Sequence, residues 1–246
     1  MDTQPITDLF CCTYARDAKW VEYMLRSVRK YAREFRDTIV MYPNHEKPTF
    51  APMEQRFPWV RWIGFNENPD GHMHQNLIKC TADLYSDADF ICHIDSDCMF
   101  TEKSVPSDFF TNGKPDLLFN KYSDLKGVPW QGITEAALGF ACPNETMRRF
   151  PFVYPRWLYA ELRKHIETLH NKPFSEYVFT APCIKGAFHG FSEFESLGSL
   201  AINSFSEFFH LYDMANGAKH QQVRQYWSWS GLTPQERFDL EWLTKE

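Results

Sequence analysis

The chain has 246 residues, of which 43% are apolar and 17% aromatic, so it can bury a large core as one domain or two small ones. Its net charge is −6 and its basic residues form no run, which argues against a protein whose main task is to coat nucleic acid or anionic lipid. The start, MDTQPITDLF, lacks the basic and apolar segments of a signal peptide, and no apolar run approaches the roughly 18 residues of a membrane span.

Strands and helices alternate in the first part of the chain. The apolar patterns predict strands at 6–15, 37–43, 59–65 and 89–94, and amphipathic helices at 17–35 and 72–86. The apolar face of the first helix consists of Trp20, Met24, Val28, Tyr31 and Phe35, and that of the second of Met73, Leu77, Cys80 and Leu84. Such alternation predicts βαβ units and a mainly parallel central sheet flanked by helices.

The second part of the chain is less regular. The patterns predict strands at 115–120, 208–213 and 223–229 and helices at 155–170, 192–202 and 233–243. We expect Pro155 near the first position of its helix. Thr233 and Glu236 have the spacing of a capping box. No repeat, low-complexity segment or linker is visible, so we expect one domain over residues 1–246.

Cysteine usage indicates the redox compartment. There are seven cysteines, an odd number, and none forms a CxxC pair. Several lie inside apolar runs, which favours reduced, buried thiols in a cytoplasmic protein and argues against a zinc site.

Two carboxylates follow the strand at 89–94. Asp95 and Asp97 are separated by Ser96, and residues i and i+2 of an extended segment point the same way. In open parallel sheets, ligands bind at the carboxyl ends of the strands. Two converging carboxylates there form a half-site for Mg²⁺ or Mn²⁺, completed by water and phosphate oxygens. The alternative is a solvated turn capped by Asp95 or Asp97.

Several separated segments resemble the nucleotide-sugar glycosyltransferases of the GT-A fold. They are TYARD, followed by a helix ending in SVRKY; Gln75-x-x-x-Lys79; DADFICHIDSDCMF, with the DxD motif; and FSEFESLG at 191–198. The resemblance implies a single Rossmann-like GT-A domain, with residues 1–100 as the nucleotide-sugar half and 101–246 as the acceptor half. The last forty residues match the family pattern less well.

The family pattern also implies site residues on the donor side. Asp97 would bind the metal that holds the diphosphate, and Asp95 would contact the metal or the ribose. Gln75 and Lys79 share one helix face, from which Lys79 could reach the phosphates. Thr13 and Arg16 lie where the nucleotide pocket is expected. The alternatives are a solvated helix lysine at Lys79, and helix capping by Asp17 with Arg16 in solvent.

Catalysis with inversion needs a base on the acceptor hydroxyl, and a carboxylate can serve. Glu193 is the first candidate. Glu195 is the second, because its spacing from Ser192 also fits a capping box. If the enzyme retains configuration, no such base is required. His210 or His220 could complete the metal site, as a late histidine does in many GT-A enzymes.

Aromatic clusters at 128–132 and 226–231 could stack on sugars, and Trp130 is favoured over Trp227 and Trp229 as the acceptor-binding ring. Core or interface packing is the plainer alternative for these rings.

The sequence therefore predicts a metal-dependent glycosyltransferase that moves a sugar from a nucleoside diphosphate donor to an acceptor hydroxyl. The acceptor would be a surface glycan or, less readily, a modified base of phage DNA, for which Arg29, Lys30, Arg33 and Arg36 could form a local basic patch.

Two other classes stay open. One is a metal-dependent phosphohydrolase or nuclease, although the nearby acids Asp83, Asp87 and Asp89 should lie at the opposite end of their strand. The other is a non-catalytic sugar-nucleotide-binding protein.

Overall fold

A five-stranded sheet forms the centre of the computed structural model, which describes residues 5–66, 70–147, 150–182, 190–228 and 231–245. The strand order is β3-β2-β1-β4-β9. The strands are β1 (Thr7–Cys12), β2 (Thr38–Pro43), β3 (Arg61–Phe65), β4 (Phe90–His93) and β9 (Phe152–Pro155). The first four run parallel and β9 runs antiparallel to β4. The prediction of a mainly parallel central sheet flanked by helices is confirmed.

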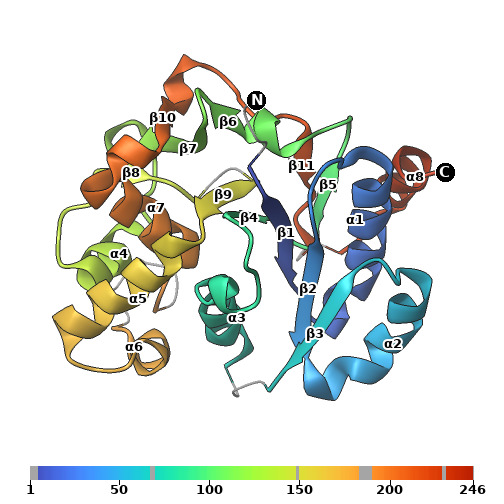
Figure 1. The fold of residues 1–246 in the computed structure, drawn as a ribbon, viewed down its shortest axis with the longest axis horizontal. Coiled ribbons are helices and arrows are strands. Elements are labelled where there is room, and N and C mark those ends of the chain that lie inside the picture. Colours follow the sequence, from blue (N-terminus) through green and yellow to red (C-terminus); the bar gives the residue numbers. More distant parts are fainter. Residues whose placement is uncertain (1–4, 67–69, 148–149, 183–189, 229–230, 246) are drawn as a thin grey trace.

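Helices cover both faces of this sheet (Figure 1). One side carries α1 (Ala18–Tyr31), α2 (Lys47–Arg56) and α8 (Pro234–Leu243). The other side carries α3 (Gly71–Lys79), α4 (Gln131–Leu138), α5 (Trp157–His170), α6 (Phe174–Thr180) and α7 (Glu193–Ser204).

Alternate residues of β1 belong to different cores. Leu9 and Cys11 pack with the α1 side, whereas Phe10 and Cys12 pack with the α7 side. Because successive side chains of a strand point to opposite faces, a strand covered on both faces is apolar throughout. This explains the apolar run from Leu9 to Cys12 in β1.

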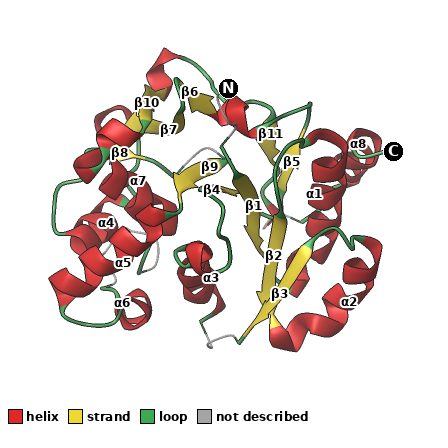
Figure 2. Cartoon of the chain, viewed as in Figure 1, coloured by secondary structure: helices red, strands yellow, loops and turns green. Residues whose placement is uncertain are grey.

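Two smaller sheets complete the fold (Figure 2). β10 (His210–Asp213), β7 (Lys114–Lys121) and β6 (Phe110–Thr111) form one, with β8 (Asn144–Glu145) paired to β7. The other is an antiparallel ribbon of β5 (Cys98–Phe100) and β11 (Val223–Gln225). The ribbon brings the C-terminal segment beside the residues that follow Asp97.

Several expected elements differ in the structure. The sequence patterns do not predict α2, because it contains Pro48 and Pro52, and proline disfavours a helix. Pro48 lies in the first turn, where a proline is tolerated. Pro155 ends β9 and does not start α5. The helix expected at 72–86 ends at Lys79, and Leu84 is exposed. The capping box of Thr233 and Glu236 is confirmed.

The acids that precede β4 pair away from its carboxyl end. Arg163 forms a two-point contact with Asp83, at 2.6 and 2.8 Å. Arg36 contacts Asp87 at 2.7 Å and also binds Asp8, near the start of β1. Arg36 is thus engaged by carboxylates and does not join a free basic patch.

Among the residues that the structure describes, no helix is both long and apolar enough to cross a bilayer. Six cysteines are free and buried, namely Cys11, Cys12, Cys80, Cys92, Cys98 and Cys142. The seventh, Cys183, lies outside the described residues, as does Trp229.

Candidate functional site

Asp95 and Asp97 belong to a tight turn at the carboxyl end of β4. The backbone N–H of Cys98 donates to the carbonyl of Asp95 at 3.0 Å, which closes the turn. The segment is therefore a turn and not the extended stretch that the sequence predicts. The side chains of Asp95 and Asp97 have different partners, described in turn below.

Lys79 joins Asp95 to Glu193. Its Nζ lies 2.9 Å from Oδ1 of Asp95 and 3.0 Å from Oε1 of Glu193. The side chains of Lys79 and Glu193 are each 5% exposed, whereas that of Asp95 is 25% exposed. Lys79 ends α3 and Glu193 begins α7, so this acid–lysine triad holds the two helices at the carboxyl end of β4. Asp95 is its most accessible member.

The triad shifts the protonation of its members. Burial acts to lower the pKa of Lys79, but Asp95 and Glu193 together hold it above its usual range, so the lysine stays charged. Burial raises the pKa of Asp95 to about 6, against the opposing effect of Lys79, and the charge of Asp97 adds to the rise. Asp95 and Glu193 share one ammonium group, and the charge of Asp97 also acts on Asp95, so the site carries excess negative charge.

Asp97 faces the segment that follows β11. It is 5% exposed, and its Oδ2 accepts the backbone N–H of Ser228 at 2.7 Å. Nε2 of Gln225 lies 3.5 Å from Oδ1, a weak contact. Among the described residues, no lysine, arginine or histidine forms an ion pair with Asp97. A buried carboxylate without a cationic partner is costly, and it favours binding of a cation.

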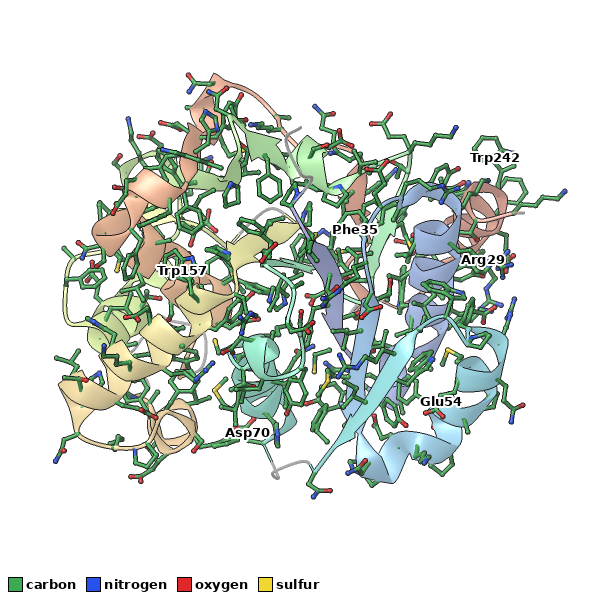
Figure 3. The ribbon with its side chains drawn as sticks, viewed as in Figure 1. Arg29, Phe35, Glu54, Asp70, Trp157 and Trp242 are labelled. Atoms are coloured by element: carbon green, nitrogen blue, oxygen red, sulfur yellow. The ribbon has the colours of Figure 1, made fainter. Side chains whose placement is uncertain are left out.

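A hollow of about 330 Å³ lies beyond the carboxyl end of β1. It is lined by Tyr14, Arg16, Glu46, Gly71, His72 and Gln75. Nε2 of Gln75 donates to the carbonyl of Cys12 at 3.1 Å, which fixes α3 against the end of β1. In Figure 3, Asp70 marks the start of α3, where its side chain accepts the N–H of Met73 at 3.1 Å.

Thr13 and Arg16 flank this hollow differently. Thr13 is fully buried, and its hydroxyl has no hydrogen-bond partner among the described residues. The side chain of Arg16 is 81% exposed and contacts Asp17 at 3.6 Å. Asp17 does not cap α1 with its side chain. Arg16 and Gln75 therefore line one hollow. Thr13 does not line it but directly precedes Tyr14, which does.

Glu195 lies on another side of α7 from the triad. Its carboxylate accepts the hydroxyl of Tyr122 at 2.8 Å and the N–H of Thr146 at 2.7 Å. It is fully buried, and burial raises its pKa to about 7. Ser192 makes no side-chain cap, so the capping box expected with Glu195 does not form. Glu195 instead ties α7 to the segments around β7 and β8.

His210 and His220 both bind Asp116 of β7. Nδ1 of His210 lies 2.7 Å from Oδ1, and Nε2 of His220 lies 3.2 Å from Oδ2. The ribbon register pairs Gln225 with Cys98 and Val223 with Phe100, so His220 lies at the end of the ribbon farther from Asp97. Neither histidine lies beside the turn that contains Asp95 and Asp97, called the acidic turn below.

The remaining candidate is Trp130. It is half-buried and directly precedes α4, which packs against α7. Two contacts could not be found from sequence spacing, namely Lys79 with Glu193 and Asp97 with Ser228, because each joins residues more than a hundred positions apart.

A scan against protein-family models gave no match for this chain, and a search of curated proteins gave no match either. In the described part of the chain, no group of three or more His, Cys, Asp and Glu side chains is placed to hold a metal ion. The site thus offers at most two carboxylate ligands of its own, Asp95 and Asp97.

Proposed function

We propose that the chain is a GT-A glycosyltransferase that moves a sugar from a nucleoside diphosphate donor to an acceptor hydroxyl. The observation that carries the proposal is the triad of Lys79, Asp95 and Glu193 at the carboxyl end of β4, beside the hollow at the end of β1. Ligands of open parallel sheets bind at this edge.

The hollow suits the nucleoside part of the donor. It combines the ring of Tyr14 with the polar groups of Arg16, Glu46 and Gln75. Rings stack on bases, and amide and charged groups fix the orientation of a ligand. The diphosphate would extend from this hollow toward Lys79, and the exposed Arg16 could close over it.

A divalent cation fits the acidic turn as a half-site. Mg²⁺ and Mn²⁺ need only one or two carboxylates when phosphate oxygens and water complete their shell. Asp97 is a buried carboxylate without a cationic partner in the described residues, and Asp95 is the accessible one. These two residues would hold the ion. When bound, it would neutralise charge on the departing diphosphate.

Glu193 would act as the base. In direct displacement, the acceptor oxygen forms a bond to the anomeric carbon as the bond from that carbon to the phosphate oxygen breaks. The hydroxyl proton passes to Glu193, and the nucleoside diphosphate leaves with the electron pair. Lys79 donates to only one oxygen of Glu193 in the described contacts, and it stays positively charged beside the leaving group.

Donor turnover tests the proposal without knowledge of the acceptor. The protein is incubated with single nucleotide-sugars and Mn²⁺, and slow release of free sugar and nucleotide is measured. We expect one donor class to be hydrolysed and EDTA to abolish this. If no nucleotide-sugar is turned over while a phosphodiester or phosphomonoester is hydrolysed with Mn²⁺, the site is a phosphohydrolase and the proposal fails.

A further inference from the structure

A second and larger hollow runs along the β5–β11 ribbon. Its volume is about 590 Å³. It is lined by Thr101, Phe150, Gln221, Val223, Arg224, Gln225 and Trp227. Val223 and Gln225 are alternate residues of β11 and so point to the same face of the strand, and Gln221 belongs to the turn that precedes it. This ribbon groove therefore offers two amides and two aromatic rings on one surface.

One end of the ribbon groove reaches the acidic turn. Nε2 of Gln225 lies 3.5 Å from Oδ1 of Asp97. The wall formed by Phe150 borders the triad, because its ring centroid is 5.8 Å from that of Phe194, the residue after Glu193. Nζ of Lys79 in turn lies 4.9 Å from the Phe194 ring. The groove is thus linked to Lys79 through the rings of Phe150 and Phe194, and it lies beside Asp97 at Gln225.

Trp227 is held in place by its two neighbours. The N–H of Tyr226 donates to the carbonyl of Asp97 at 3.0 Å, and the N–H of Ser228 donates to Oδ2 of Asp97 at 2.7 Å. Between them, Trp227 has a φ of 62°, in the left-handed region, and is 54% exposed. A large residue is strained in this conformation and keeps it only where its surroundings impose it. The two hydrogen bonds to Asp97 therefore hold the Trp227 ring where it lines the groove.

The side chains that line the ribbon groove indicate which class of ligand it binds. Aromatic rings stack on the apolar faces of sugars, and amides and hydroxyls pair with sugar hydroxyl groups. A nucleic acid would need several cations along its phosphates. Among the described residues that line the groove, Arg224 is the one cation, and its guanidinium stacks over Tyr226, 4.8 Å from the ring centroid. Lys30 and Arg33 donate to backbone carbonyls.

We propose that the ribbon groove binds a glycan by stacking a sugar ring on Trp227, and that it is the acceptor subsite. The second part rests on the proposed transferase function, and the first part does not. Trp227 then takes the role expected for Trp130.

A binding assay without donor or Mn²⁺ tests the inference. The labelled full-length protein is applied to a glycan microarray, and the best-bound saccharide is titrated by saturation-transfer NMR. The test variant is Trp227→Gly, since glycine accepts a positive φ without strain. Trp227→Phe keeps a ring. Trp242→Ala is the matched control, because Trp242 is 74% exposed on α8 (Figure 3) and lines a neighbouring hollow but not the ribbon groove.

We expect the wild type and Trp242→Ala to bind the same saccharide, Trp227→Gly to bind it at least about tenfold more weakly, and Trp227→Phe to lie between them. Thermal unfolding checks that each variant is folded. The inference is overturned if no glycan binds the wild type, if Trp227→Gly binds as the wild type does, or if a single-stranded oligodeoxynucleotide binds instead. If a glycan binds but no nucleotide-sugar is turned over, glycan binding by the ribbon groove is supported and only the transferase proposal is overturned.

Discussion

Oδ2 of Asp97 accepts the backbone N–H of Ser228 at 2.7 Å, across 131 positions of sequence. The second carboxylate of the DxD motif is therefore tied to the C-terminal segment and not to the helix that precedes β4. The first carboxylate, Asp95, is tied to Lys79. Each aspartate of the motif thus fixes a different part of the chain around one turn.

Asp97→Asn should remove Mn²⁺-dependent donor turnover and leave the fold intact. The amide oxygen can still accept the N–H of Ser228, but the charge that favours a cation is lost. Loss of a charged ligand interaction should weaken Mn²⁺ binding by about 1.5–3 kcal/mol or more. Turnover and Mn²⁺ affinity are measured together with the thermal midpoint, and exposed Asp239→Asn serves as the control. Undiminished turnover in Asp97→Asn would remove Asp97 from the metal site.

Lys79→Met should destabilise the protein by roughly 3–5 kcal/mol, because it leaves two carboxylates without their shared buried partner. The loss should shrink at low pH, where protonation of Asp95 removes one of the two uncompensated charges. The matched control is Lys19→Met, which breaks the Lys19–Glu22 contact of 2.8 Å at a lysine that is 46% exposed. Surface pairs of that kind contribute about 0–1 kcal/mol. Urea unfolding at two pH values measures both variants, and equal losses would contradict a buried triad.

Glu193→Gln should lower sugar transfer by roughly a hundredfold or more, the usual effect of removing a general base. The fold should survive, since the amide oxygen can still accept from Lys79. Glu195→Gln is the matched control two residues away, bound to Tyr122 and Thr146, and it should keep its rate. The decisive measurement is the transfer rate at saturating donor. A normal rate in Glu193→Gln with an inactive Glu195→Gln would exchange the two roles, and two active variants would favour a retaining mechanism.

The local patterns predicted the four parallel strands of the central sheet and most helices, because both faces of the sheet are buried and each helix has one apolar face, but they missed β9. These patterns were wrong where contacts between distant parts of the chain determine the local structure. The proline-rich α2 is held by burial of Phe50 against the sheet. Spacing placed Asp95 and Asp97 on one extended edge, but the hydrogen bond from Cys98 to Asp95 folds them into a turn.

The candidate site was predictable in its residue types and not in its pairing. The positions of Gln75, Lys79 and Asp95 followed from the order of segments along the chain. The contact of Lys79 with Glu193 depends on how α3 and α7 pack, which no local pattern encodes. Likewise the hydrogen bonds that place Trp227 beside Asp97 join residues far apart in the sequence, so no local pattern distinguishes Trp227 from Trp130.

Glu195 should make the stability of the fold depend on pH. Its folded pKa, about 7, lies above the usual value of 4.5, because burial disfavours the charged carboxylate. The folded state therefore holds a proton that the unfolded state has lost between these two values. The resulting stabilisation is fully present below pH 4.5 and disappears as pH rises through 7, by an amount on the order of 3 kcal/mol.

Glu195→Gln removes this titration and leaves other ionisable groups in place. The free energy of unfolding, measured by urea at several pH values from acid to mildly alkaline, should fall more steeply with rising pH in the wild type than in Glu195→Gln. Exposed Glu207→Gln is the control, and its curve should stay parallel to that of the wild type. If the wild type and Glu195→Gln run parallel throughout, Glu195 titrates near its usual range, and the contacts with Tyr122 and Thr146 hold an ionised carboxylate at all these pH values.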